Sequence, residues 1–370
     1  MAQPWFRQKV PVLPITVIDD FKMSEPKLQC PLPFQYDQIV MAHGGGGRLM
    51  QQLLDSMIQP VFSNPLLDQK HDSAVFNIGD QKIAFTTDSY VVDPLFFAGG
   101  DIGKLAVCGT LNDLAMSGAK PLYITCSLII EEGFAIQDLQ RIVRSMQNTA
   151  QESGVLIVTG DTKVVERGKG DGLYINTAGV GTIETGVSVH PSKIHEKDAV
   201  IINSDLGRHG IAIMQEREGF DFGTKIESDC VVLSDLVQNL ISSGIEIHCM
   251  RDLTRGGLAS VLIEIADSAK CHIEISETKI PVRENVKSAC EILGFDPLYI
   301  ANEGCFALFV PQSQVNDALF CLKQHDTGKQ ARQIGRVKTK SEQGMVSLKT
   351  ALGISRVLDL YSGEQLPRIC

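Results

Sequence analysis

The sequence predicts an α+β protein with two domains of similar size, and three observations support this prediction. The chain has 370 residues, which is enough for two hydrophobic cores of ordinary size. Apolar stretches typical of strands alternate with stretches of helical periodicity in both halves. The hydrophobic content of 44% and the charged content of 21% are ordinary for a globular protein. We therefore expect an extended or disordered arm at 1–36, an N-terminal domain at 37–186, a C-terminal α/β domain at 187–350 and a mobile tail at 351–370.

The first domain should begin with a short strand at 38–41 that leads into four consecutive glycines at 44–47. A run of glycines cannot form the interior of a stable helix or strand, so it predicts a mobile loop whose amides can approach a phosphate. A helix should follow, because apolar residues recur on one face from Leu49 to Met57. The other elements expected here are strands at 74–78, 82–86, 123–130, 155–159 (a buried strand) and 173–180, and helices at 102–117 and 137–152.

The second domain should begin near His190 and repeat the alternation of strands and helices. Leu236 and Leu240 belong to an apolar face at helical spacing, which predicts a helix at 231–243. The other elements expected are strands at 199–203, 305–310, 333–337 and 345–348, and helices ending at 218 and spanning 258–268 and 315–324. Beyond 353 the chain has no strong periodicity apart from a short apolar patch at 357–358.

Composition excludes several classes of function. A formal net charge of −10 argues against nucleic acid as a partner, since phosphate backbones need a basic surface. No apolar run is long enough to span a bilayer, and the first 35 residues lack the layout of a signal peptide. The ten cysteines are scattered singly without a zinc-binding spacing, which is typical of reduced thiols in a cytosol. We therefore expect a cytoplasmic protein that binds neither nucleic acid nor membrane.

The common sequence signatures of nucleotide binding are missing. Residues 99–105, Gly-Gly-Asp-Ile-Gly-Lys-Leu, lack the Ser or Thr that binds Mg²⁺ in a Walker A loop and have the wrong spacing. No GxGxxG pattern follows an expected strand either. A nucleotide site in this chain must therefore be built in another way.

Aspartates recur instead at strand ends and in tight polar turns. The set is Asp72, Asp88, Asp113, Asp161 and Asp252. Carboxylate oxygens suit Mg²⁺ that bridges nucleotide phosphates, and Lys163, Arg251 and Arg255 could balance the phosphate charge. A single such aspartate is most often a turn or cap residue. Five of them beside Gly and Lys or Arg predict an enzyme that binds a magnesium nucleotide without a P-loop.

The chain ends with Pro-Arg-Ile-Cys, so Cys370 is the last residue. A chain terminus is the part of a protein least constrained by packing, and its side chain can be carried into a pocket. Taken alone, a terminal cysteine can equally well be an inert free thiol. Together with the predicted nucleotide site, it suggests a thiol that visits more than one site.

These motifs resemble those of the HypE family of hydrogenase-maturation carbamoyl dehydratases, from about Ile39 to the C-terminus. The matching segments are 43–50, 87–92, 99–103, 112–116, 160–166, 250–257 and 367–370. The superfamily includes selenophosphate synthetase, thiamine-monophosphate kinase and aminoimidazole ribonucleotide synthetase, which use ATP to phosphorylate an oxygen or a related acceptor. The resemblance implies a two-domain aminoimidazole-ribonucleotide-synthetase-like fold. In that fold the N-terminal mixed sheets of two subunits form a dimer barrel, and the C-terminal domain is an α/β sandwich.

The resemblance also implies roles for individual residues. Cys370, Lys163 and Glu303 would be catalytic, with Lys163 and Glu303 facing the modified cysteine. The carboxylates implied to hold the metal are Asp72, Asp88, Asp113 and Asp252. The residues implied to bind the nucleotide are His43, Gly44, Gly45, Gly46, Gly47, Arg48, Asn112, Asp161, Thr162, Arg251 and Arg255. The family often has Ser where this chain has Gly45 or Gly46, which should matter little to contacts made by backbone amides.

The implied reaction is the ATP-dependent dehydration of an S-carbamoyl group on Cys370 to an S-cyanate, with ATP and Mg²⁺ as cofactors. A homodimer would receive the carbamoyl group from the carbamoyltransferase HypF. It would then deliver cyanide to iron held by a HypC–HypD complex, for the [NiFe] hydrogenase. A terminal thiol on a flexible tail suits this sequence of events, because the same atom must reach both a partner and the ATP site.

Two other functions stay open on the sequence. A small-molecule kinase or synthetase of the same superfamily would have no use for Cys370, and a selenophosphate synthetase would carry a reactive Cys near the glycine loop, where 43–48 have none. A non-catalytic carrier would use Cys370 as a metal ligand and hydrolyse no ATP. We expect His209, in Gly-Arg-His-Gly, to be a helix-start residue rather than a catalyst. Cys108, Cys126 and Cys305 are expected to be structural.

Overall fold

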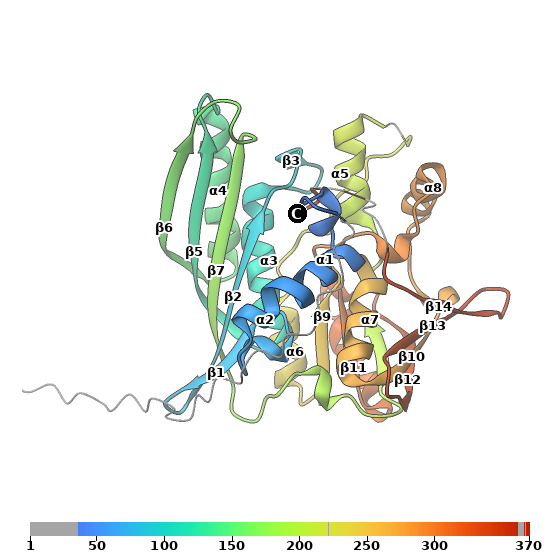
Figure 1. The fold of residues 1–370 in the computed structure, drawn as a ribbon. Coiled ribbons are helices and arrows are strands. Elements are labelled where there is room, and N and C mark those ends of the chain that lie inside the picture. Colours follow the sequence, from blue (N-terminus) through green and yellow to red (C-terminus); the bar gives the residue numbers. More distant parts are fainter. Residues whose placement is uncertain (1–35, 221, 362–365, 367) are drawn as a thin grey trace, which may run out of the picture. The chain divides into compact units, whose positions relative to one another are not determined.

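The computed structural model describes residues 36–220, 222–361, 366 and 368–370. The arm predicted at 1–36 therefore lies outside the described residues except for Tyr36. Figure 1 shows two sheets with helices packed against them, and the C-terminal residue lies between them, beside β3 and α5. Both sheets combine parallel and antiparallel pairs, as expected for an α+β protein.

The first sheet has five strands in the order β1-β2-β7-β5-β6. Their bounds are β1 Ala74–Ile78, β2 Gln81–Tyr90, β5 Lys120–Glu131, β6 Leu156–Val165 and β7 Leu173–Ile183. Only β5 and β6 pair in parallel, so the sheet is mixed, as predicted. A two-stranded ribbon, β3 Phe96–Phe97 and β4 Gly100–Asp101, lies outside it.

One face of this sheet is covered by α3 Ile102–Met116 and α4 Ile136–Glu152. Burial alternates residue by residue along β7, which is the pattern of a strand with one face packed against a core. The Asp101 side chain begins α3 by accepting the amide hydrogens of Gly103 and Lys104 at 2.8 and 3.1 Å. Helix α3 itself is buried on nearly all sides, because the second half of the chain packs on its other face.

The expectation of a buried strand at 155–159 was wrong. The strand is β6, and nine of its ten residues are exposed, including Leu156 at 63% and Val158 at 54%. The sequence run is apolar, but β6 is at the edge of the sheet, and the residues that the structure describes leave most of its side-chain surface uncovered. An exposed apolar edge strand of this kind is a site for association with another surface.

The second sheet has seven strands in the order β14-β13-β10-β12-β8-β11-β9. Their bounds are β8 Ala199–Ile202, β9 Cys249–Asp252, β10 Cys271–Ser276, β11 Phe306–Val310, β12 Arg332–Lys340, β13 Met345–Lys349 and β14 Ser355–Leu358. The helices of this half are α5 Arg208–Glu218, α6 Ser234–Ser242, α7 Gly257–Ala269, α8 Glu284–Leu293 and α9 Val315–Lys323.

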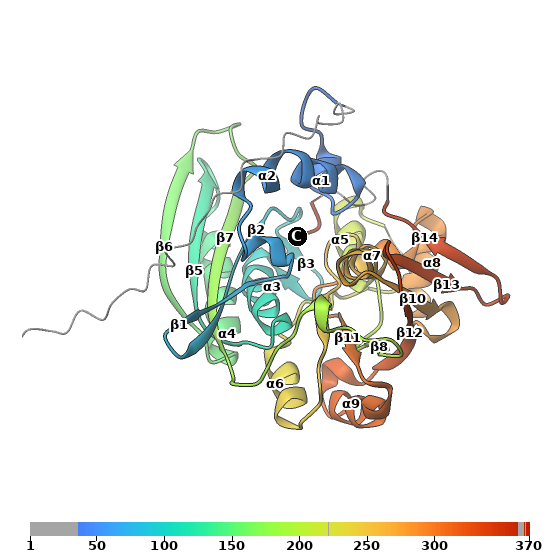
Figure 2. The same ribbon diagram turned by 60° about the horizontal axis from the view of Figure 1, so that its bottom comes forward.

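Helices cover both faces of the second sheet. Residues of β8 alternate between two cores: Val200 and Ile202 pack with α7, whereas Ala199 and Ile201 pack with α6 and α9. Figure 2 shows α6 and α9 on one side of β8 and β11 and α7 on the other. This arrangement is the predicted α/β sandwich. Strand β14 lies inside the segment predicted as a tail, because Val357 and Leu358 pair with β13.

The segment before the first sheet differs from the expectation at its start. The strand predicted at 38–41 is instead a loop followed by a 3₁₀ turn, Met41–His43, because the amide of Val40 donates to Nδ1 of His43 at 3.0 Å. The predicted helix is present as α1 Arg48–Leu53, a π-helical turn Leu54–Ile58 and α2 Gln59–Phe62. No helix among the described residues is long and apolar enough to cross a membrane.

Candidate active site

The end of the chain is bound in a pocket between the two halves. The amides of Val91 and Asp93 donate to the carbonyls of Cys370 and Arg368 at 3.1 and 3.2 Å, an antiparallel pairing that follows the end of β2. The Arg368 side chain donates to the carbonyl of Val91 at 3.0 Å and forms an ion pair with Asp171. Ile369 is 4% exposed. These contacts place the Cys370 side chain within the protein.

The lining of the pocket around Cys370 includes three parts of the chain that are distant in sequence, besides Tyr299 and Ala301. The glycine loop 44–47 forms one wall, Ser89 and Val91 after β2 form the second, and Arg255 with Gly256 forms the third. Figures 1 and 2 both show the C-terminus next to α1, which follows the glycine loop. The structure therefore brings the predicted phosphate loop and the predicted catalytic thiol to one site.

The glycine loop depends on the absence of a side chain at Gly46. This residue has φ +75°, and a Cβ atom there would lie 2.9 Å from Cβ of Arg255 and 3.0 Å from its backbone carbonyl carbon. The loop is further held by Arg48, whose guanidinium is 2.6 Å from Asp359 and whose amide donates to the carbonyl of Tyr361. The loop thus packs directly against the arginine that faces the thiol.

The four aspartates predicted to hold a metal face one another across the interface of the two halves. Asp72 precedes β1, Asp88 is in β2, Asp113 is in α3 and Asp252 ends β9. Burial and the neighbouring carboxylates raise the pKa of Asp113 well above its usual range, and burial raises that of Asp252 to about 6. The buried Oδ2 of Asp72 has no hydrogen-bond partner. The cluster therefore carries negative charge that protein groups compensate only in part.

The thiol and a buried carboxyl group share this environment. Burial raises the pKa of Cys370 to about 12, with nearby Arg255 opposing the shift and Glu303 adding to it. Glu303 is 3% exposed, and its Oε1 has no hydrogen-bond partner. Burial and the repulsion of Asp252 raise the pKa of Glu303 well above its usual range. Glu303 is therefore a buried carboxyl group beside the thiol, with one oxygen that no described residue contacts by a hydrogen bond.

Two hydrogen bonds hold the backbone that carries Glu303. The amides of Glu303 and Gly304 donate to the two carboxylate oxygens of Asp229 at 3.1 and 3.0 Å. Asp229 is itself 4% exposed, so these hydrogen bonds are shielded from water. The position of Glu303 is thus set by its backbone, and its side-chain oxygen stays available.

Three residues predicted to contact the nucleotide also make contacts within the protein. Arg251 lies 2.5 Å from Asp72 and 3.1 Å from Glu264, so its charge is already neutralised by the protein. Asn112 is 2% exposed and joins α3 to the second half by bonding to the backbone at 231 and 233. His43 is 8% exposed and forms its turn with Val40. These contacts explain the three side chains without a nucleotide.

Asp161, Thr162 and Lys163 lie on β6, the exposed edge strand of the first sheet. Lys163 is 2.6 Å from Asp161, and their side chains are 68% and 58% exposed. Sheet order separates β6 from β2, which carries Asp88, by three strand steps, or roughly 14 Å at ~4.8 Å a step. The structure therefore does not bring Lys163 to the site of its own chain.

Sequence reasoning missed the residues of α5 that bind the tail. His209 was expected to be a helix-start residue, and it is in the first turn of α5, but its Nε2 also contacts the carbonyl of Ile369 at 2.9 Å. Arg217, in the last turn of α5, donates to the carbonyl of Arg368 at 2.8 Å. The only sequence signal was the Gly-Arg-His-Gly segment, which does not indicate that the chain terminus will lie on it.

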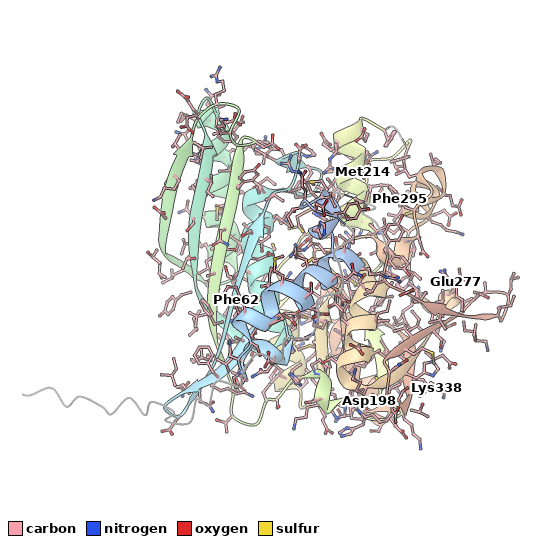
Figure 3. The ribbon with its side chains drawn as sticks, viewed as in Figure 1. Phe62, Asp198, Met214, Glu277, Phe295 and Lys338 are labelled. Carbon is pink, nitrogen blue, oxygen red and sulfur yellow. The ribbon has the colours of Figure 1, made fainter. Side chains whose placement is uncertain are left out.

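Within the described part of the chain, one other group has the residue types of a metal site. His195, Asp198 and His248 place possible ligand atoms within 4.8 Å of one another. Oδ2 of Asp198 already accepts from Nδ1 of His248 and from the amide of His195, both at 2.7 Å. Asp198 lies low in the view of Figure 3, well below the C-terminus marked in Figure 1. These hydrogen bonds explain why the three side chains lie together. The group stabilises a turn that is away from the active site.

Two domain families match this chain: the AIR synthase related protein N-terminal domain over residues 70–183, and the corresponding C-terminal domain over residues 196–347. The chain is 45% identical over 343 residues to the carbamoyl dehydratase HypE of Cupriavidus necator, covering 92% of this chain and 97% of that protein. It is 43% identical over 339 residues to the carbamoyl dehydratase HypE of Escherichia coli, covering 90% and 100%.

Solved structures give the same result. A crystal structure of a HypE–HypF complex matches with 45% identity and a TM-score of 0.79, covering 84% of this chain and 99% of that chain. HypE in complex with ATP matches with 42% identity and a TM-score of 0.76, covering 90% and 100%. Thiamine monophosphate kinase from Aquifex aeolicus, at 17% identity and a TM-score of 0.61 over 84% and 99%, shares the fold.

Proposed function

This chain belongs to the HypE family of carbamoyl dehydratases, and from that membership we propose that it converts an S-carbamoyl group on its own Cys370 into an S-cyanate with ATP. The S-cyanate supplies cyanide ligands for the iron of a [NiFe] hydrogenase. The observation that carries the proposal is the docked tail, since Cys370 lies in one pocket with the glycine loop and Arg255. A small-molecule kinase does not use its own terminal thiol, so this position of Cys370 favours the dehydratase.

The glycine loop and Arg255 are proposed to bind the phosphates of ATP. Backbone amides at 44–47 can approach phosphate oxygens closely because no Cβ intervenes. The side chain of Arg255 is 42% exposed and its nearest acid, Asp88, is 3.9 Å away, so the guanidinium is less neutralised than that of Arg251. We expect Arg255 to balance the charge of the transferring phosphoryl group.

The four aspartates fit a divalent cation. Asp72 has an unpaired buried oxygen, and burial with mutual repulsion raises the pKa of Asp113 and Asp252. Among the described residues, these carboxylates do not form a group of three ligand atoms within 4.8 Å. That spacing suits Mg²⁺, which keeps waters and phosphate oxygens among its ligands. When bound there, Mg²⁺ would neutralise charge developing on the phosphoryl oxygens.

The reaction divides into two steps. The carbamoyl oxygen of Cys370–S–C(=O)–NH₂ attacks the γ-phosphorus of ATP while one N–H proton leaves, which gives Cys370–S–C(=NH)–OPO₃²⁻ and ADP. Loss of the second N–H proton and of phosphate then gives Cys370–S–C≡N. Glu303 is proposed to accept these protons, because its Oε1 is unpaired among the described residues and the carboxyl group lies beside the thiol.

We further propose that the protein acts as a homodimer through the exposed face of its first sheet. Apolar side chains on this face remain open to solvent in the single chain. They are Phe85 at 47%, Tyr123 at 45%, Ile129 at 44%, Leu156 at 63% and Val158 at 54%. A patch of this size on adjacent strands is typical of an interface. Such a dimer would carry Lys163 of one subunit toward the site of the other.

The proposed partners follow from the chemistry of the thiol. Carbamoyl transfer needs Cys370 outside its pocket, where a donor enzyme can reach it, and a HypE–HypF complex exists in the solved relative. Cyanide delivery needs an iron-bearing acceptor, for which we propose a HypC–HypD complex in the cytoplasm. Neither event can occur with Ile369 and Cys370 docked as they are here.

The mass of the intact protein tests the proposed function. Incubation with the carbamoyl donor should add one carbamoyl group, and Mg-ATP added afterwards should remove one water. Cys370→Ala should abolish both changes. Carbamoylation without the ATP-dependent loss would indicate a carrier, and ATP turnover that is independent of Cys370 would indicate a small-molecule kinase.

A further inference from the structure

The docked tail depends on a chain of hydrogen bonds that ends in His209. The amide of Cys230 donates to Oγ of Ser228 at 3.0 Å, and Oγ of Ser228 is 2.8 Å from Nδ1 of His209. Nε2 of His209 is 2.9 Å from the carbonyl oxygen of Ile369. His209 has no exposed surface, so these contacts are shielded from water.

The chain of contacts determines which nitrogen of His209 carries the proton. A carbonyl oxygen can only accept, so Nε2 must donate to Ile369. The Ser228 hydroxyl oxygen already accepts from the Cys230 amide, which leaves its hydrogen free to donate to Nδ1. The imidazole is therefore the neutral Nε2–H tautomer, and burial lowers the pKa of His209, which favours this neutral form.

The first turn of α5 also supplies the surface on which the tail packs. A Cβ atom at Gly210 would lie 2.9 Å from Cδ1 of Leu366, so the tail approaches the helix backbone directly. The edge of the Phe97 ring faces His209 from the other side, with ring centroids 5.5 Å apart. Figure 3 marks this helix by Met214. Ile369 is adjacent to Cys370, so fixing its carbonyl fixes the thiol to within one residue, about 3.8 Å along the chain.

We propose that His209 is the positioning residue that holds the tail in its docked state, through its neutral Nε2–H donor to the carbonyl of Ile369. Without that donor, docking would bury an unpaired carbonyl, which is costly, whereas the undocked tail would lose nothing. The equilibrium constant for docking should then fall by about fivefold or more. The consequence for dehydration rests on the function proposed above, whereas the docking role does not.

Two substitutions of His209 distinguish the contact made by Nδ1 from the contact made by Nε2. Asn at 209 places an amide near Nδ1, within reach of Ser228, but is too short to reach the tail. Gln extends to the position of Nε2 and can donate to Ile369. His272→Asn is the matched control, because His272 also bonds to a serine, Ser347 at 2.7 Å, in the second sheet.

The first measurement is the rate at which iodoacetamide alkylates Cys370, followed by peptide mass spectrometry on the full-length protein. His209→Asn should raise this rate about fivefold or more, and His209→Gln should return it to within about twofold of the parent. Cys321, which is partly exposed on α9, and buried Cys230 report on the fold in the same sample. Equal rates in the parent and His209→Asn, or equal rates in the two variants, would overturn the proposal.

If His209→Asn also accelerates alkylation of Cys230, the fold has loosened, and Ser228→Ala becomes the deciding variant. It keeps the imidazole but removes the hydroxyl that fixes the tautomer. It should still raise the Cys370 rate, and an unchanged rate would contradict the proposal.

The second measurement follows the mass of the carbamoylated protein after Mg-ATP is added. His209→Asn should slow the loss of water, at most by the factor by which the docking equilibrium constant falls, leave carbamoyl transfer unchanged, and be rescued by His209→Gln. An unchanged dehydration rate would refute the positioning role. If even the parent protein acquires no carbamoyl group, the proposed function fails, whereas the alkylation rates still decide the docking role.

Discussion

Glu303 is a buried carboxyl group with an oxygen that no described residue pairs, and it lies beside the thiol of Cys370. If it accepts protons during dehydration, Glu303→Gln should slow that step by about 100-fold or more. Carbamoyl transfer should be unaffected, since it takes place with the tail undocked. A time course of intact mass separates the two steps. Glu342→Gln, at an exposed position, is the control, and comparable dehydration in both variants would exclude Glu303 as the base.

The raised pKa of Asp252 predicts how stability and Mg²⁺ binding change with pH. Burial raises its folded-state pKa to about 6 from an ordinary value near 4. Its contribution to stability in the metal-free protein is therefore complete below about pH 4 and is lost as the pH rises through about 6. Above that range the ionised cluster should bind Mg²⁺, and below it the protonated carboxyl groups should not.

Thermal unfolding with and without MgCl₂ checks this expectation. Mg²⁺ should raise the melting temperature near neutral pH and have little effect near about pH 5. Asp252→Asn should reduce the stabilisation near neutral pH. NaCl at the same ionic strength controls for screening. An equal Mg²⁺ effect at both pH values would be incompatible with a site made from these carboxylates.

The residues of the site differ in how far they could be predicted. The aspartates could be, because strand ends and tight turns converge at one edge of a fold, and the structure does bring Asp72, Asp88, Asp113 and Asp252 together. Arg251 could not, because its partner Glu264 lies 13 positions further along and only the packing of α7 brings it near. His209 could not be predicted either, because its proposed role depends on the position that the C-terminal residues take in the fold.

At the scale of elements, the glycine loop makes a prediction that separates two neighbouring glycines. Gly46 has φ +75° and lies against the backbone of Arg255, whereas Gly44 has φ −109° and a Cβ there would meet its nearest atom, the carbonyl of Met41, at 3.5 Å. Gly46→Ala should weaken ATP binding about tenfold, since the left-handed conformation alone costs ~1–2 kcal/mol. Gly44→Ala should cause a clearly smaller loss. Isothermal titration with ATP measures both, and equal losses would mean that the loop conformation is not what binds phosphate.

Strand β6 shows why an apolar run does not establish burial. The run Leu-Ile-Val at 156–158 is the pattern of a buried strand, but burial also requires a packing partner, and the described residues of a single chain leave these side chains largely exposed. The proposed dimer would supply it. Leu156→Lys should therefore shift the protein from the mass of a dimer to that of a monomer in light scattering. Ile292→Lys on α8, which is 73% exposed, should leave the mass unchanged.

The fold was more predictable than the assembly, for a related reason. Periodicity identified most helices and strands of both halves, since most of them bury an apolar face within the chain. Strands β9 and β10 and helix α8 were not predicted. The strand predicted at 38–41 failed because a side-chain contact of His43 with Val40 competes with extended backbone. Strand β14 was missed because it is short and three of its four residues are exposed.

At the scale of the whole molecule, the position of Lys163 distinguishes a site made by one chain from a site shared by two. Lys163 lies on β6, three strand steps from β2, so its side chain cannot span the roughly 14 Å to the site of its own subunit. In the proposed dimer, each site would combine Cys370 and Glu303 of one subunit with Lys163 of the other. A homodimer of either single variant, Lys163→Ala or Glu303→Gln, would then have two inactive sites.

A heterodimer of these two variants decides between the arrangements. If Lys163 acts across the interface, one of the two sites receives Glu303 from the first subunit and Lys163 from the second, and that site is intact. Co-expressed heterodimers, purified through two different tags, should then lose water from about half as many carbamoylated chains as the parent dimer. If Lys163 acts within its own chain, both sites are defective and no recovery occurs. Recovery in the heterodimer, with none in either homodimer, would show that the exposed strand β6 completes the site of the neighbouring subunit.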